Sequence, residues 1–397
     1  MQYNPQLTLS PLREVDFRAS FADLKTALQS LPDPRRTTTN KKYPLEAMLL
    51  ATLAALLSNQ TNQQATAEWL AAQDLATKRA LGFESERTPH QTTFHRLFAR
   101  LKAARLQLAL NAYFDPPRPA KIRPRGSEPV AIDGKCLRGK LPFETEGQGV
   151  PTHLLSLFSH TTGLVLSQKV IETGKNELSS APDLLAGVEW QGRVLTGDAA
   201  FCYPTLCRTV VEAGGDYFFV LKANQATLQS EAALVFDTNL IPKGLAFDLR
   251  CYKESDKAHG RLEIRQARAS NELACLSAWP YLAQVVEIRR EWQHKGQWRS
   301  YTVYAVTSLP REIAQVADLL ALKRGHWGIE NKLHWIRDEV FKEDKSPVHK
   351  GEGPFVMAAL RNGALNILRK AGHTRITAKL RLNACRVETV LKLLALT

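Results

Sequence analysis

The first third of the chain carries hydrophobic residues at helical spacing. Residues 17–30 place apolar side chains every three or four positions, which predicts an amphipathic helix. Residues 45–58 are apolar on every side, so we expect a helix at the buried centre of a helical domain. Another helix is expected over residues 62–73, around Trp69. The pattern predicts an all-α N-terminal domain over residues 1–114.

The last part of this predicted domain is basic. Thr88 has the character of an N-cap, with Pro89 at the first helical position and Gln91 where a capping box places it. These residues begin one predicted helix, which continues over the segment TTFHRLFARLKAARLQLAL. A short helix, a turn and a basic capped helix are typical of a helix-turn-helix module that reads DNA. A plain helical bundle fits the same pattern equally well.

Residues 115–127 separate this helical pattern from a pattern of strands. The segment contains four Pro and four basic residues, so we expect a stiff linker that follows DNA phosphates.

Short apolar runs with β character follow the linker and alternate with helical patterns. The predicted order over residues 128–223 is three strands, a helix, a strand, a helix and a strand. Residues 224–307 predict a β-rich insertion with no helix in it, because the segments around 247–253, 262–267, 282–292 and 297–307 alternate. Helices return over residues 308–397. The predicted strands are 128–133, 152–159, 164–171, 193–198 and 216–222, and the helices are 176–188 and 203–213.

The net charge of the chain is more informative about its function than its overall composition is. The 397 residues are 44% hydrophobic and 23% charged, as in ordinary globular proteins, but the formal net charge is +14. Such a surplus favours a polyanionic partner, nucleic acid first and an anionic membrane surface second.

The longest apolar run, residues 45–57, is too short and too polar to span a membrane, and the first residues lack the pattern of a signal peptide. The six Cys are scattered without zinc-site spacing, so we expect reduced thiols and a cytoplasmic protein. With DNA as its partner, we expect the protein to associate with the nucleoid.

Three acids stand out as candidates for chemistry. Asp133 and Asp198 each end a predicted buried strand, where the ligand sites of such sheets lie, and each is followed by a small residue. A lone Asp in this position is more often a turn former or a helix cap. The third acid, Glu330, lies in a predicted helix over residues 324–344, where four-residue spacing places His326 and His334 on its face.

Three converging carboxylates require a cation, and an all-oxygen set suits Mg²⁺, with Mn²⁺ as a substitute. In a chain of charge +14, the natural chemistry for such a set is two-metal phosphoryl transfer on nucleic acid.

These segments carry a family resemblance. VAIDGKCLRGK, LTGDAAF, FVLKANQ, HGRLEIR and RGHWGIENKLHWIRDEVFKEDKS resemble the bacterial insertion-sequence DDE transposases of the H-repeat-associated type. The resemblance implies an RNase H-like α/β core with a β-rich insertion. It also implies that Asp133, Asp198 and Glu330 bind the metal and catalyse cleavage and transfer of DNA strands at insertion-sequence ends. The partner implied is double-stranded DNA, engaged by a homodimer.

The resemblance is not complete. Related transposases often carry a Tyr, Arg, Glu, Lys pattern along the last helix. The corresponding residues here are Lys323, His326, Glu330 and Arg337, so the basic character is kept and the Tyr is not.

Further residues are candidates for contact with DNA through phosphates, base edges or stacking. A solvated loop, a plain hairpin or a core aromatic is the simpler interpretation of several of them. These candidates are Lys135, Arg138, Lys222, Asn224, Gln225, His259, Arg261, Arg324, His326, Trp327, Lys332, His334 and Arg337.

Two other functions compete with this interpretation. The His326, Glu330 and His334 column has the spacing of a zinc site on a helix, which would suggest a metallohydrolase with no role for the two Asp. Alternatively, the chain is a catalytically silent DNA-binding protein that descends from a transposase. Bound zinc would favour the first alternative, whereas DNA binding without cleavage would favour the second.

Overall fold

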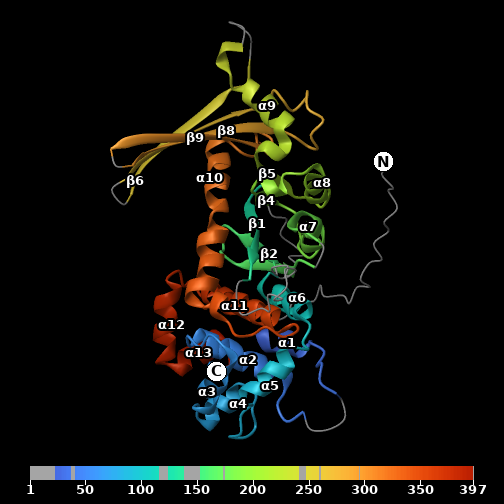
Figure 1. Ribbon diagram of the computed structural model, residues 1–397, viewed down its shortest axis with the longest axis vertical. Coiled ribbons are helices and arrows are strands. Elements are labelled where there is room, and N and C mark those ends of the chain that lie inside the picture. The colour runs from blue at the N-terminus through green and yellow to red at the C-terminus, as the bar shows by residue number, and fades with distance from the viewer. Residues whose placement is uncertain are drawn as a thin grey trace, which may run out of the picture.

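The computed structural model describes residues 23–36, 41–115, 124–137, 153–172, 175–240, 247–258, 261–294 and 296–396. Its centre is a nine-stranded sheet in the order β3-β2-β1-β4-β5-β9-β8-β7-β6 (Figure 1). Strands β1, β4 and β5 are parallel to one another, and the other neighbouring pairs are antiparallel. The strands are β1 Glu128–Cys136, β2 His153–Ser159, β3 Val165–Val170, β4 Arg193–Gly197, β5 Asp216–Leu221, β6 Arg250–Ala258, β7 Arg261–Ser270, β8 Gln284–His294 and β9 Gln297–Thr307.

The first five strands form the RNase H-like core that the sequence predicts. Their side chains alternate between two buried faces, as expected for strands covered by helices on both sides. Val130 and Ile132 of β1 pack under α7 (Glu177–Leu185) and α8 (Pro204–Glu212) on one face. On the opposite face, Phe218 of β5 packs in the cluster of α10 (Val316–His326). The sheet therefore holds α10 against the strands that carry the two Asp residues.

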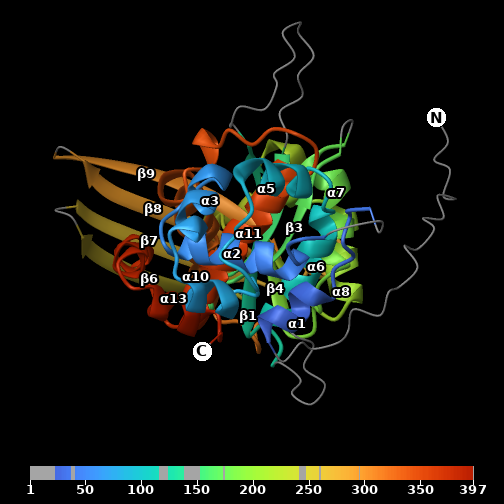
Figure 2. The same ribbon diagram turned by 90° about the horizontal axis from the view of Figure 1, so that it is seen from below.

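The predicted insertion continues the core sheet. β9 pairs with β5 from Phe218↔Thr307 to Leu221↔Tyr304, and β8, β7 and β6 extend the sheet outward, where they project to one side (Figure 2). The prediction of only β structure in residues 224–307 is wrong, because α9 (Ala226–Val235) lies there. Its buried Leu228 and Ala232 stand four residues apart, which is a helical spacing.

The remaining helices form a bundle below the sheet. The apolar α2 lies at its centre with 12 buried residues, as its sequence predicts, and packs against α11. Helices from both ends of the described chain therefore share one hydrophobic core, which also includes Ile329 and Leu333 beside Glu330. The bundle helices are α1 Leu24–Gln29, α2 Leu45–Leu57, α3 Gln63–Ala71, α4 Leu75–Ala80, α5 Gln91–Phe98, α6 Ala103–Phe114, α11 Gly353–Lys370, α12 Ile376–Ala384 and α13 Val387–Leu393.

The single basic helix predicted from Thr92 onward is two helices, α5 and α6. Glu352, far away in the sequence, stabilises the break: its N–H donates to Ala99 O at 3.2 Å, and its carboxylate accepts from Ala103 N–H at 3.2 Å. The N-cap of α5 is His90 and not Thr88. The break does not follow from local sequence, because the capping group of α6 comes from another part of the chain.

Among the described residues, no helix is long and apolar enough to cross a membrane.

Candidate functional site

Asp133 and Asp198 lie beside each other at one edge of the sheet. The parallel pairing of β1 with β4 ends at Ala131↔Thr196, and each Asp follows its strand's last paired residue by two positions. Asp133 is held in β1 and accepts a hydrogen bond from Gly134 N–H at 2.9 Å. Asp198 is exposed and caps the turn Ala199–Phe201, where it accepts from Ala200 N–H at 2.8 Å. The sequence pattern therefore identified two acids that the fold brings to the same edge.

Glu330 reaches this edge from the other side. It begins a π-helical turn, Glu330–His334, shortly after α10 ends. Oε2 of Glu330 lies 3.0 Å from Nδ1 of His334, and because a carboxylate only accepts, the imidazole N–H donates. This hydrogen bond lowers the pKa of Glu330 below its ordinary value. Glu330 is therefore ionised and its carboxylate is oriented by His334.

Asp133, Glu330 and His334 form a compact group. One ligand atom of each lies within 4.8 Å of those of the other two, and Nδ1 of His334 is 3.6 Å from Oδ2 of Asp133. Burial, together with the charges of Asp198, Glu177 and Glu330, raises the pKa of Asp133 to about 7. Such a crowded carboxylate is stabilised by a cation, and its oxygen donors fit Mg²⁺ or Mn²⁺. Asp198 is close enough to act on Asp133 but lies outside the group of three.

His326 does not join Glu330 and His334 in one column. Its Nδ1 lies 3.2 Å from Oγ1 of Thr196, and Nε2 of His160 lies 3.0 Å from the same hydroxyl. Burial lowers the pKa of His326 to about 4 and that of His160 to about 3, so both imidazoles are neutral at neutral pH. His326 thus connects α10 to β4, and the predicted zinc column is not formed.

Two side chains that the sequence predicts to contact DNA are buried in ion pairs. Lys135 is 8% exposed, and its Nζ lies 2.5 Å and 2.7 Å from the carboxylate oxygens of Asp338. Arg337 is fully buried and donates to Glu343 and to Gln168, each at 2.8 Å. Both side chains hold the segment after Glu330 in place. His334, only 3% exposed, likewise faces the acids and not the surface, which corrects its assignment to DNA.

Asn224 and Gln225 support the turn that carries Asp198. Nδ2 of Asn224 donates to Ala199 O at 2.7 Å, and Nε2 of Gln225 donates to Cys202 O at 3.0 Å. These amides are engaged with the backbone, so the structure gives them a positioning role where the sequence suggested contact with bases.

The remaining candidates are exposed or undescribed. Lys222 and Lys332 are exposed. Arg324 pairs with Glu254 at 2.6 Å. Arg138, His259 and the side chain of Arg261 lie outside the described residues.

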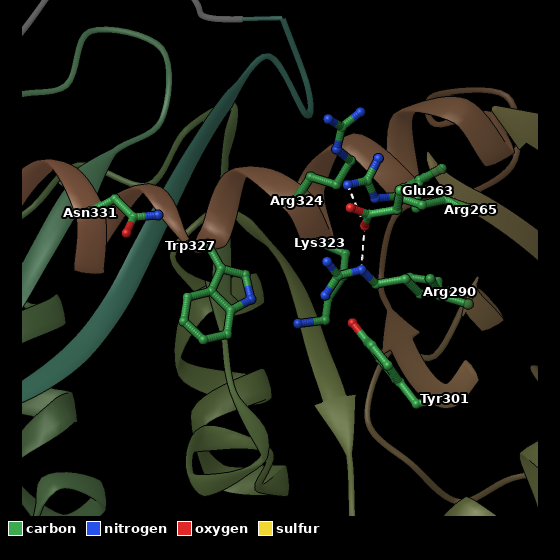
Figure 3. Close-up of a pocket in the computed structure, with 10 residues that line it drawn as sticks. Glu263, Arg265, Arg290, Tyr301, Lys323, Arg324, Trp327 and Asn331 are labelled. Carbon is green, nitrogen blue, oxygen red and sulfur yellow. Dashed lines mark hydrogen bonds and ion pairs between the residues drawn. The ribbon is translucent and has the colours of Figure 1, made fainter. Parts of the chain in front are cut away.

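A basic pocket of about 470 Å³ lies between α10 and the strands β7, β8 and β9 (Figure 3). Glu263 is bound to Arg265 and Arg290 on one side of it. Lys323 points into the middle and makes no hydrogen bond or ion pair with the described residues (Figure 3). Burial, followed by the charge of Lys222, lowers the pKa of Lys323, and the charge of Asp198 opposes this shift. The other lining residues are Ile288, Tyr301, Leu320, Arg324, Trp327 and Asn331.

Sequence reasoning missed Glu177, His160 and Thr196 as neighbours of the acids. Glu177 follows the helix cap Asn176 and was interpreted only as part of a helix start. His160 directly follows β2, and neither its sequence context nor that of Thr196 differs from ordinary strand ends.

Both the N-terminal helices and the sheet-containing part of this chain are similar to known proteins. Residues 124–367 match the family model of the transposase DDE domain, and residues 25–114 match its associated domain. An uncharacterized protein in the dhlA 3′ region of Xanthobacter autotrophicus is 30% identical over 278 residues, or 69% of this chain and 90% of that protein. The H repeat-associated putative transposase YhhI of Escherichia coli (strain K12) is 29% identical over 60% of this chain and 63% of that protein.

Among solved structures, the piggyBac transposase synaptic complex with hairpin DNA matches with a TM-score of 0.41 and 13% identity. The match covers 95% of this chain and 80% of that chain. The family model spans more than half of the chain. The chain therefore belongs to the transposase DDE domain family.

Proposed function

We propose that this protein cleaves DNA at the ends of an insertion sequence and transfers the freed strands by metal-dependent phosphoryl transfer. The observation that carries the proposal is the meeting of Asp133, Asp198 and Glu330 at one sheet edge from three different elements. The acids are spaced far apart in the sequence, and only the fold brings them together. Family membership supports the same chemistry.

The residues present fit a pair of divalent cations, and we assign Mg²⁺ to them, with Mn²⁺ as a substitute. Asp133 would hold both cations, Asp198 one and Glu330 the other. When bound, the cations supply Lewis acidity for the attacking and leaving oxygens of the phosphate. The chain's own contribution is positioning: β1 and β4 fix the two Asp residues, and His334 holds the carboxylate of Glu330. Positioning of the reacting groups accounts for much of the rate enhancement in enzymatic phosphoryl transfer.

DNA would lie along the face that contains the basic pocket. Lys323 provides an unpaired cation for a phosphate, and the 60%-exposed Trp327 provides an aromatic surface for a base. We infer that two copies of the chain act together, because an insertion sequence has two inverted ends. A protein with this substrate acts in the cytoplasm, on the DNA of the nucleoid.

The test is incubation of the purified chain with a duplex that carries the element's end, in Mg²⁺, in Mn²⁺ and in EDTA. The proposal predicts strand cleavage with either metal and none in EDTA. DNA binding without cleavage in either metal would instead identify a catalytically silent DNA-binding protein.

A further inference from the structure

Glu177 brings a fourth carboxylate to the acids of the proposed site. It is the first residue of α7, and Asn176 fixes the start of this helix through a capping box with Ser179. α7 packs against β2 and against the turn that follows Asp198. The backbone at Glu177 is therefore held by its own cap and by both of these neighbours.

Gly134 makes room for this carboxylate. A Cβ placed on Gly134 would lie 1.8 Å from Oε1 of Glu177, which is far inside van der Waals contact. Gly134 does not have a positive φ, so its backbone conformation does not require a glycine. The close approach of Glu177 is thus the structural reason for a glycine directly after Asp133.

The carboxylate of Glu177 is half-buried and makes no hydrogen bond or ion pair with the part of the chain that the structure describes. Burial, and then the charge of Asp198, raises the pKa of Glu177, although His153 opposes this shift. An acid that stabilised only the helix terminus could remain in solvent, where it would gain about 0.3–1 kcal/mol from the helix dipole. Glu177 instead lies against the residue next to Asp133.

On the basis of the proposed function, we propose that Glu177 is a fourth acid of the cation site. Together with Asp133 and Asp198, it binds one of the two cations. Its carboxylate binds that cation directly or through a water of its hydration shell. Asp133 and Glu330, whose carboxylate His334 holds in place, then bind the other cation. This chain would thus use four acids where the motif suggests three.

The experiment is titration of the full chain with Mn²⁺ in the absence of DNA, followed by electron paramagnetic resonance. Glu177→Gln keeps the size of the side chain and removes its charge. We expect it to weaken Mn²⁺ binding about 10- to 100-fold, as loss of a supporting group does at other metal sites. Gly134→Ala should weaken binding in the same way, because its Cβ displaces the carboxylate. The matched control is Glu172→Gln, an acid that is 62% exposed and paired with Lys175, and it should bind Mn²⁺ like the wild type.

Thermal unfolding in EDTA shows that each variant is folded. Unchanged Mn²⁺ affinity in folded Glu177→Gln would overturn the inference and leave the proposed function intact. If the wild type itself bound no Mn²⁺, the metal-dependent function and the inference would both be wrong.

Discussion

Replacement of Glu330 by Gln is the sharpest perturbation of the proposed site. The substitution keeps the length of the side chain and removes one negative charge from the group with Asp133 and His334. The carboxylate is 52% exposed and its one hydrogen bond, to His334, can be kept by the Gln oxygen. We therefore expect a change in folding stability within about 0.5 kcal/mol.

The effect on cleavage should be much larger. A preorganised group aimed at charge that develops in the transition state contributes about 3–4 kcal/mol, or about 10²- to 10³-fold in rate. Glu330→Asp keeps the charge but shortens the side chain by one methylene, which moves the carboxylate away from the proposed cation. It should also be impaired, with partial rescue by Mn²⁺, which suits a looser oxygen site than Mg²⁺ does.

The assay is single-turnover cleavage of a duplex that carries the element's end, with Glu339→Gln as the matched control. Glu339 lies in the same helical segment, is 59% exposed, and has an ion-pair distance of 3.5 Å to Nζ of Lys342. The control should cleave at the wild-type rate. A folded Glu330→Gln that cleaves as fast as Glu339→Gln would refute the assignment of Glu330.

Three further predictions follow from the packing and charges. In metal-free protein, the pKa of Asp133 rises from 3.8 to about 7 on folding, so stability should fall as the pH rises from about 4 to 7. Asp133→Asn should remove this loss and raise the free energy of unfolding at pH 8 by on the order of 1–2 kcal/mol after allowance for partial exposure, measured as a higher Tm. Glu343→Gln leaves buried arginines without their partner and should destabilise the fold by about 3–5 kcal/mol in urea unfolding. Trp327→Ala should weaken DNA binding about 5- to 100-fold by loss of stacking. Trp335→Ala, a substitution of a similarly exposed residue outside the pocket, should change binding little in the same titration.

Much of the fold could be predicted because its signals are local. Each of the first five strands is a short apolar run bounded by turn residues, and α2 is apolar on every side. Asp133 and Asp198 were identifiable because parallel strands present their carboxyl ends at one edge. The Gly after Asp133 also indicated a close neighbour, although the sequence could not show that this neighbour is Glu177.

The sequence-based predictions differ from the structure where contacts between residues far apart in the sequence determine the local conformation. Arg337 has the sequence context of an exposed helical cation, but Gln168 on another strand and the nearby Glu343 bury it completely. The break between α5 and α6 depends on Glu352. A regular helix would place His326 above Glu330, whereas α10 ends at His326, with Trp327 as its C-cap, and the imidazole of His326 bonds to Thr196 instead. None of these pairings has a signature in local sequence.

The central claim is that the acids perform chemistry on DNA that other residues bind. It is tested most directly by Asp133→Ala, assayed for binding and for cleavage on the same duplex carrying the element's end. Asp133 is partly buried at the sheet edge, and we assign it to the metal and not to DNA, so binding should stay within a few-fold of the wild type and should weaken steeply with salt. Cleavage in Mg²⁺ and in Mn²⁺ should be abolished. Wild-type cleavage by the folded variant, or loss of binding together with cleavage, would contradict the account.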